Sequence, residues 1–305
     1  MLPPVIVLGC TASGKSDVAM EVATSWATPV HIVAADAMQV YRRMNIGTAK
    51  PTTHDQELVP HHCLDLVEPN ERFTVAAYLE SAQQAFGDID AAGARALVVG
   101  GTGLYMSAIV DGLSMPGEWP EIRAELENNA DTAAMYAELV ARDPKAATKM
   151  EPNNRRRIIR ALEVCRGSGT TFSSFGPGLD QYPATDITMV GIRWSRDALG
   201  HRIESRVHAM VAAGLIDEVR ALVSAPKGLS PTAAQALGYK EVMAHLEGHI
   251  TLTEAIDLIV LRTRQFAVRQ ERWFRRDPRI LWIDIEDNAP SAVSKVAPVV
   301  RGFLS

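Results

Sequence analysis

Gly9-Cys10-Thr11-Ala12-Ser13-Gly14-Lys15-Ser16 is the stretch of sequence that decides the fold of this chain. Its spacing, a glycine, four further residues and then Gly-Lys-Ser, is that of a phosphate-binding P-loop. The apolar run Val5-Ile6-Val7-Leu8 comes directly before it and predicts a buried strand. Directly after it, Val18, Val22 and Trp26 fall four residues apart and predict an amphipathic helix. This strand-loop-helix context makes the motif specific.

The glycines allow such a loop to curl, so that several backbone amides point inward and the helix N-terminus attracts an anion. Lys15 supplies a positive charge to the phosphates, and the Ser16 hydroxyl is the expected magnesium ligand. We therefore assign diphosphate or nucleotide binding to all eight residues of the loop. Nucleoside triphosphates are the usual occupants, so a kinase or an ATPase is the default interpretation unless other residues overturn it.

Short apolar runs rich in β-branched residues predict buried strands at 5–8, 30–33, 96–99, 189–192 and 280–283. Helical spacing separates the first three runs, with Val75, Leu79, Ala82 and Phe86 marking the second helix. Strand and helix in alternation predict an α/β fold, a P-loop NTPase-like parallel sheet flanked by helices, with ligands at the carboxyl ends of the strands.

A second region lacks strand signals and predicts a helical insertion domain. We expect the first part of the catalytic core at 1–116, the insertion at 117–186 and the second, mostly helical part of the core at 187–305. Within this last part, helical spacing predicts helices at about 197–213, 232–247 and 253–275.

Composition indicates a folded protein of the reducing cytoplasm. Of 305 residues, 47% are hydrophobic and 22% charged, which is ordinary for a globular chain. The three cysteines, Cys10, Cys63 and Cys165, have no spacing typical of disulfides or zinc. We expect neither export nor membrane insertion, because no signal peptide fits before Gly9 and no apolar run spans a bilayer. The net charge of −5 means that a nucleic acid must meet local basic patches.

Two polar residues follow the second and third predicted strands. Asp36 should lie beside the reacting end of a phosphate-held ligand and is a candidate general base; a water-mediated magnesium ligand or a cap of the next turn are the alternatives. Thr102 lies in a Gly-Gly-Thr-Gly turn, where its hydroxyl can meet a phosphate, a magnesium-bound water or a substrate sugar. The turn could instead cap the following helix.

Longer motifs resemble the tRNA dimethylallyltransferase (IPP transferase) family. They run in order over nearly the whole chain and are more specific than the P-loop alone. They are residues 36–51, beginning Asp36-Ala37-Met38-Gln39, then Pro60-His61-His62, Gly100-Gly101-Thr102-Gly103-Leu104-Tyr105, residues 154–163, Gln235-Ala236-Leu237-Gly238-Tyr239-Lys240-Glu241 and residues 269–275.

The resemblance implies transfer of a dimethylallyl group from dimethylallyl diphosphate to the exocyclic amine of the adenosine 3′ of the anticodon, with Mg²⁺ and release of diphosphate. Its partners are then dimethylallyl diphosphate and the anticodon stem-loop of tRNA, without a membrane, and a monomer is favoured. The implied catalytic residues are Asp36, Thr102 and Lys15. The implied tRNA contacts are Asp36, Ala37, Met38, Gln39, Thr102, Arg123, Arg156, Arg157, Ile158, Ile159 and Arg160.

Three rival functions fit parts of the sequence. An adenylate isopentenyltransferase would modify free nucleotide and would not need the arginine-rich insertion. A small-molecule P-loop kinase should carry an arginine-bearing lid over ATP. A non-catalytic RNA-binding protein would have no use for the set of Lys15, Ser16 and Asp36.

Clustered basic residues are the candidates for meeting RNA. One cluster, which follows a predicted N-cap at Asn153 or Asn154, consists of Arg155, Arg156, Arg157, Arg160 and Arg166. Positive charge near a helix N-terminus opposes the helix dipole, so this placement predicts an anionic partner or neighbouring carboxylates, and a solvated face is the alternative. A second stripe on the last long helix consists of Arg262, Arg269, Arg272 and Arg276. Gln265 and the aromatic pair Trp273-Phe274 lie nearby and could contact bases, but we assign the aromatic pair to the core.

Other residues have open or structural roles. We expect His61 and His62 to be structural, because adjacent side chains on an extended segment point apart. Lys50 either stabilises phosphate or is a solvated surface lysine. Departures from the family pattern stand at Cys10 (commonly proline), Ala37 (serine), Arg43 (glycine) and Asn45 (aspartate), and they leave contacts around the site open.

Overall fold

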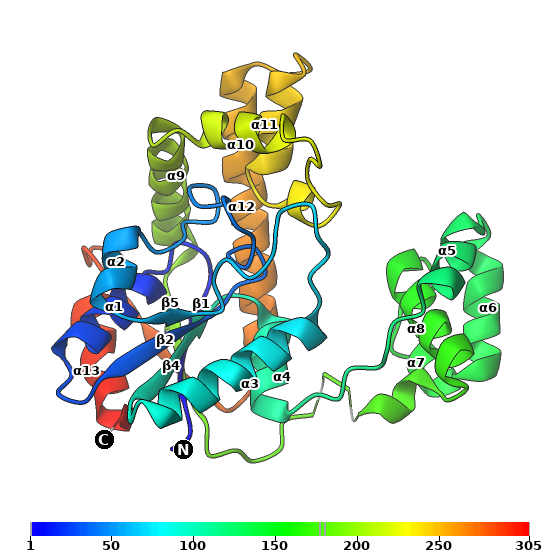
Figure 1. Cartoon of the computed structure of the whole chain (residues 1–305), viewed down its shortest axis with the longest axis horizontal. Helices are drawn as coiled ribbons and strands as arrows, with labels where there is room; N and C mark the ends of the chain where they lie inside the picture. Colours follow the sequence, from blue (N-terminus) through cyan, green and yellow to red (C-terminus); the bar gives the residue numbers. More distant parts are fainter. Residues whose placement is uncertain (1, 177, 180, 305) are drawn as a thin grey trace. The chain divides into compact units, whose positions relative to one another are not determined.

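A parallel sheet forms the centre of the larger of two units in the computed structural model, which describes residues 2–176, 178–179 and 181–304 (Figure 1). In the described chain the sheet has six strands in the order β3-β2-β4-β1-β5-β6. Five of them confirm the predicted runs. The strands are β1 (Val5–Gly9), β2 (Val30–Ala35), β3 (His61–His62), β4 (Arg95–Gly100), β5 (Thr188–Arg193) and β6 (Ile280–Asp284).

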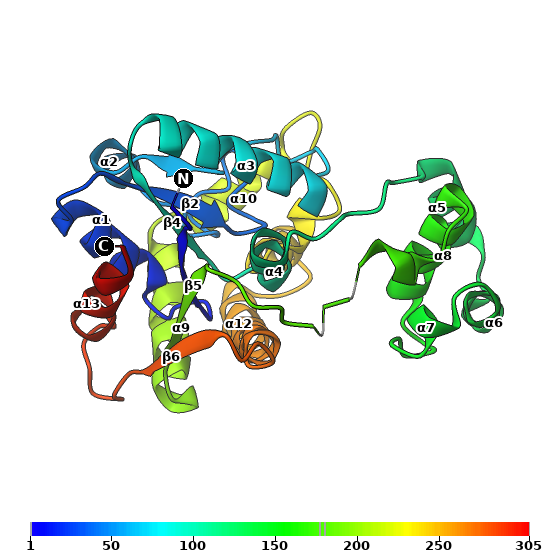
Figure 2. The same cartoon turned by 90° about the horizontal axis from the view of Figure 1, so that it is seen from below.

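Alternating side chains of the strands build two cores, one on each face of the sheet. Val5 and Val7 pack toward α1 (Lys15–Ser25) and α13 (Val293–Leu304). Ile6 and Leu8 pack on the other face with residues of α3 (Val75–Ala91) and α4 (Gly103–Asp111). Figure 2 shows α1 and α13 on one side of the strands and α3 on the other. Because both faces of the central strands are covered, β1, β2, β4 and β5 are mostly apolar, which is why their runs were visible in the sequence.

The second half of the larger unit adds helices beside the sheet's carboxyl edge. They are α9 (Arg196–Ala212), α10 (Leu215–Val223), α11 (Tyr239–Leu246) and α12 (Leu252–Phe274), with a short α2 (Thr53–Leu58) in the first half. The predicted helix at 232–247 is wrong in its first part. A 3₁₀ turn occupies Ala233–Gln235, and Gly238 has a φ of +89°, a left-handed conformation that interrupts a helix, so α11 begins only at Tyr239.

The smaller unit, Asp111–Pro183, contains helices joined by loops and no strand among its described residues. Its core is formed by Leu126, Met135, Leu139, Ile158 and Leu162. The side chain of Asn154 accepts a hydrogen bond from the amide of Arg157 and caps the longest helix of the unit, which decides between the two predicted caps. The helices are α5 (Pro120–Asn128), α6 (Thr132–Arg142), α7 (Pro144–Ala147) and α8 (Arg155–Ser168), followed by a 3₁₀ turn at Phe172–Phe175.

None of the helices in the described part of the chain is both long enough and apolar enough to cross a bilayer.

Candidate active site

The P-loop follows β1 and leads into α1, as its motif predicts. Two of its residues have left-handed backbones, Ala12 with φ +62° and Gly14 with φ +87°. This curl brings the start of α1 against a cavity of about 810 Å³ that Thr11, Lys15 and Ser16 line. The first amides of a helix have no partner within it, so those at the start of α1 are donors for an anion in the cavity.

Not every residue of the loop offers its side chain to that cavity. The thiol of Cys10 donates to the carbonyl of Ala267 at 3.2 Å, and burial raises the pKa of this thiol to about 11. The amide of Thr11 donates to Oε1 of Gln270 at 2.9 Å. The Ser13 side chain is buried, at 1% exposure. The loop thus turns these three groups toward the protein, and Lys15 and Ser16 toward a ligand.

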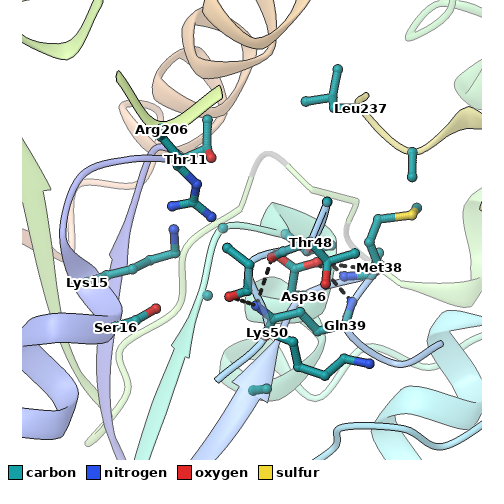
Figure 3. A pocket seen from close by; sticks show the side chains of 18 of the residues that line it. Thr11, Lys15, Ser16, Asp36, Met38, Gln39, Thr48, Lys50, Arg206 and Leu237 are labelled. Atoms are coloured by element: carbon teal, nitrogen blue, oxygen red, sulfur yellow. Dashed lines mark hydrogen bonds between the residues drawn. The ribbon is translucent and has the colours of Figure 1, made fainter. Parts of the chain in front are cut away.

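Two cations lie at the same end of the cavity. Arg206 of α9 lines it together with Lys15, and Figure 3 shows the guanidinium beside the ammonium. Burial and the positive charge of Arg206 lower the pKa of Lys15 to about 8, against the opposing effect of Asp36. Burial also lowers the pKa of Arg206. Sequence reasoning missed Arg206, because an arginine on an amphipathic helix carries no sign of what it faces.

Asp36 and Thr102 lie side by side at the ends of β2 and β4. Oδ1 of Asp36 accepts from the amide of Met38 at 2.8 Å, while Oδ2 has no hydrogen bond among the described residues. The Thr102 hydroxyl accepts from the amide of Ala37 at 3.0 Å, and the Thr102 amide donates to the Ala35 carbonyl at 3.3 Å. Asp36 therefore caps its own turn with one oxygen and keeps the other for a ligand.

The opposite wall of the cavity is braced by amides and carboxylates. Nε2 of Gln39 donates to the carbonyls of Thr48 and Ala49, both at 3.1 Å. Glu218 of α10 accepts from the consecutive amides of residues 45–47 at 2.8, 2.7 and 3.1 Å. The carboxylate that holds this segment is thus Glu218, although Asn45 replaces the family's aspartate. Glu218 carried no recognisable signal in the sequence.

The structure contradicts both predictions for Lys50, that it stabilises phosphate and that it is a solvated surface lysine. Its side chain is 2% exposed, and Nζ donates to the Tyr41 carbonyl at 2.7 Å and to Oδ1 of Asp65 at 2.6 Å. Although the residue borders the cavity, its charge is already engaged by the loop that carries Asp65, so it is neither a solvated lysine nor a free phosphate ligand.

The remaining departures and histidines have structural partners. Arg43 has a φ of +64°, a conformation that favours the family's glycine, and its guanidinium pairs with Glu68 at 2.5 Å. Nδ1 of His61 lies 2.7 Å from the Val59 carbonyl, and a ring nitrogen of His62 lies 3.1 Å from one of His31. These contacts agree with the structural interpretation of both histidines.

The arginines of the smaller unit divide into two groups. Arg156 and Arg157 at the start of α8 are exposed and form no ion pair among the described residues. In contrast, Arg123 and Arg160 both pair with the fully buried Glu163, at 3.4 and 3.1 Å. Only the first two are therefore uncommitted cations.

Four further residues of this unit are committed to its fold. Arg155 donates to carbonyls at the end of α5, including that of Asn129 at 2.6 Å, and Arg166 pairs with Glu138 and Glu125. Ile158 and Ile159 are 0% and 4% exposed in the core. Their side chains are therefore engaged in the core and anchor the helix that presents Arg156 and Arg157, and a contact of these two residues with RNA stays a prediction.

The predicted stripe on α12 is also divided. Arg262 pairs with Glu241, and Arg276 lies beyond the end of the helix with its guanidinium 4.6 Å from the centre of the Trp273 ring. Arg269 and Arg272 stay exposed on the helix. Phe274 is buried, which confirms its assignment to the core, whereas Trp273 is half-buried, packs against the same core and also lines the cavity.

Comparisons with known proteins match this chain along nearly its whole length. The IPP transferase family matches residues 39–277, and the isopentenyl transferase family matches residues 5–64. A tRNA dimethylallyltransferase of Desulforudis audaxviator is 43% identical over 289 residues, 93% of each chain. Another, of Geobacter metallireducens, is 43% identical over 305 residues, 98% of this chain and 96% of the relative.

Solved structures agree with these relatives. The tRNA isopentenylpyrophosphate transferase of Bacillus halodurans is 35% identical, with a TM-score of 0.70 over 100% of this chain and 97% of that one. A eukaryotic dimethylallyltransferase acting on tRNA is 25% identical, with a TM-score of 0.81 over 98% of this chain and 78% of that one.

The pKa of Lys15 predicts how binding of a diphosphate ester in the cavity depends on pH. Because its pKa is lowered to about 8, the ammonium loses its proton as pH rises through that value. Phosphate esters complete their ionisation near pH 6, so the charge of the diphosphate ester itself no longer changes. We expect its affinity, measured by calorimetry without tRNA, to be constant from pH 7 to 7.5 and to fall by about tenfold per pH unit above 8.

The matched control is Lys15→Arg, which keeps a charge at every pH of the series and should give a flat profile. A wild-type profile as flat as that of the arginine variant would contradict the assignment.

Proposed function

The chain belongs to the IPP transferase family, and we propose that it transfers the dimethylallyl group of dimethylallyl diphosphate to tRNA. The acceptor is the exocyclic amine of the adenosine 3′ of the anticodon, and diphosphate is released. One observation carries the proposal beyond family membership. Lys15 of the P-loop, Arg206 of α9 and the carboxylate of Asp36 line one cavity, so that a leaving diphosphate and an attacking amine can occupy it together (Figure 3).

The reaction is a substitution at the allylic carbon. The amine nitrogen forms a bond to C1 of the dimethylallyl group, while the bond from C1 to the diphosphate oxygen breaks with its electron pair. Lys15, Arg206 and the first amides of α1 stabilise the negative charge that develops on the diphosphate. The free Oδ2 of Asp36 accepts the proton that the amine loses.

Ser16 is the residue that would hold a divalent cation. The described chain contains no cluster of three or more histidine, cysteine, aspartate or glutamate side chains arranged for a metal. A single hydroxyl nevertheless fits Mg²⁺, which is usually bound through one or two protein oxygens together with substrate phosphates and water. Bound there, Mg²⁺ would neutralise charge on the diphosphate, and the protein would contribute Ser16 to its shell.

Recognition of tRNA rests on local basic groups in this proposal. The chain as a whole carries a charge of −5, yet Arg156 and Arg157 stand exposed and unpaired among the described residues at the start of α8. The relatives named for tRNA favour tRNA over free nucleotide as the acceptor. We also propose a monomer in the cytoplasm, since one chain supplies every group of the site and all three cysteines are free thiols.

The central test is transfer of label. Purified protein is incubated with radiolabelled dimethylallyl diphosphate, Mg²⁺ and unmodified tRNA, with AMP and ATP as competing acceptors. Label in tRNA alone is expected, and label in AMP or ATP instead would identify the chain as an adenylate isopentenyltransferase. Transfer of label to neither class of acceptor would refute the proposed reaction.

Asp36→Asn isolates the role of the carboxylate as base. The amide retains an oxygen that can accept from the Met38 amide, so the turn is kept while the proton acceptor is removed. We expect the single-turnover rate to fall by a factor of about 100 to 10,000, with tRNA affinity within a few-fold of the wild type. Asp88→Asn on the surface of α3 is the control, and an Asp36→Asn rate equal to the control's would exclude the base assignment.

Arg156→Ala/Arg157→Ala tests the two uncommitted cations. Each arginine that neutralises a phosphate of the tRNA should contribute about 0.7 to 0.9 to the slope of log affinity against log salt. We therefore expect a shallower slope for the double variant and a melting temperature that is equal to that of the wild type or slightly higher, because neither guanidinium pairs within the described chain and both oppose the helix dipole.

Arg160→Ala is the matched comparison on the same helix. It removes one partner of the buried Glu163, so we expect a decrease of about 1 to 3 kcal/mol in the free energy of unfolding with the salt slope retained. Reversal of these two results, with Arg160 setting the slope and the Arg156 and Arg157 pair setting stability, would contradict the division of the arginines.

A further inference from the structure

We propose that Gln270 is a positioning residue that couples the donor half of the active site to the acceptor half. Its side-chain amide is the direct link between the P-loop and the turn that carries Thr102, and it sets the distance between the leaving group and the base. The inference deepens the proposed function and rests on it, because donor and acceptor halves have meaning only for a group transfer.

Both ends of the Gln270 amide are engaged. Oε1 accepts from the Thr11 amide at 2.9 Å, and Nε2 donates to the Gly101 carbonyl at 2.9 Å. The residue is 7% exposed and lines the cavity together with Thr11 and Gly101. Thr11 follows β1 and Gly101 follows β4, so a single side chain of α12 joins the ends of two neighbouring strands.

The same helix, α12, leaves no room for a side chain at the two glycines of the turn that carries Thr102. A Cβ added to Gly101 would lie 2.3 Å from Nε2 of Gln270, and one added to Gly103 would lie 2.3 Å from the Trp273 ring. The two glycines that flank Thr102 therefore both lie in close contact with α12. The Thr102 hydroxyl then accepts from the Ala37 amide, next to Asp36. The contacts thus run without a break from the P-loop to the base.

A second contact makes α12 a rigid support. The thiol of Cys10 donates to the carbonyl of Ala267, one helical turn before Gln270, so the helix meets the P-loop at two points. A capping box at Thr251 and Glu254 closes the start of this 23-residue helix. Misplacement of reacting groups by about 1 Å can cost about 100-fold in rate, so a support that joins the two halves bears directly on turnover.

An amide satisfies both contacts at this position, and an ionised carboxylate satisfies only one. Ionised glutamate has acceptors but no donor, so it could accept from Thr11 and would repel the Gly101 carbonyl. Gln270→Glu therefore keeps the size of the side chain and removes one half of the link. It is the sharpest variant for separating a positioning role from simple packing.

The test compares Gln270→Glu with the wild type and with Gln84→Glu, a matched change on the exposed surface of α3. Rates of transfer from dimethylallyl diphosphate to tRNA are measured at saturating substrates, together with both KM values and the melting temperature. We expect kcat to fall by about 10- to 100-fold with both KM values within about threefold, while Gln84→Glu matches the wild type. A lowered melting temperature with unchanged kcat per folded site would assign Gln270 to stability alone and overturn the proposal.

A second variant keeps the test decisive if Gln270→Glu does not fold. Gly101→Ala presses a methyl group on the same amide, so kcat should fall, and the fall should be much smaller when Gln270→Ala has removed that amide. Decreases in kcat that multiply independently would overturn the coupling. Failure of the wild type to transfer label to tRNA would instead refute the proposed function, so the two failures are distinguishable.

Discussion

The ammonium of Lys15 and the guanidinium of Arg206 are two partly buried positive charges in the same part of the cavity, and the rest of the active site depends on this pairing of like charges. Both cations stabilise a bound diphosphate. Without an anion they repel each other and are poorly solvated, which is why the pKa of Lys15 is lowered. Asp36 opposes the repulsion but cannot neutralise both cations. The site is therefore complementary to an anion with more than one charge, and most of all to one whose charge increases as a bond to it breaks.

The sequence predicted the sheet well because both faces of its central strands are buried, so five strands appear as mostly apolar runs. The sixth, β3, consists of His61 and His62, and two polar residues paired with β2 leave no pattern to detect. Helical spacing predicted the structure less well at 232–247. The apolar periodicity continues across Gly238, but the left-handed backbone of Gly238 interrupts the helix. Periodicity reports which face is buried, and only local backbone chemistry reports where an element begins.

The same distinction explains which site residues were found. The P-loop, Asp36 and Thr102 follow strands, and the geometry of a parallel sheet brings the ends of its strands to one edge. Arg206, Glu218 and Gln270 lie within helices, where spacing cannot name the partner that tertiary packing provides. The prediction for Lys50 was wrong although the residue lies in a family motif. The motif does not show that its ammonium is bound by Asp65 and by the Tyr41 carbonyl.

The arginines of the smaller unit show how an acidic protein can keep a surface for RNA. Arg123, Arg155, Arg160 and Arg166 are matched by carboxylates or carbonyls of their own unit, so they add little to its field. Arg156 and Arg157 stand in the first turn of α8, where positive charge opposes the helix dipole and no carboxylate of the described chain offsets it. Stability alone would favour acidic residues there. A polyanion that reaches this turn removes the conflict, so the placement is unfavourable for the free protein and favourable for its complex, as expected of a binding residue.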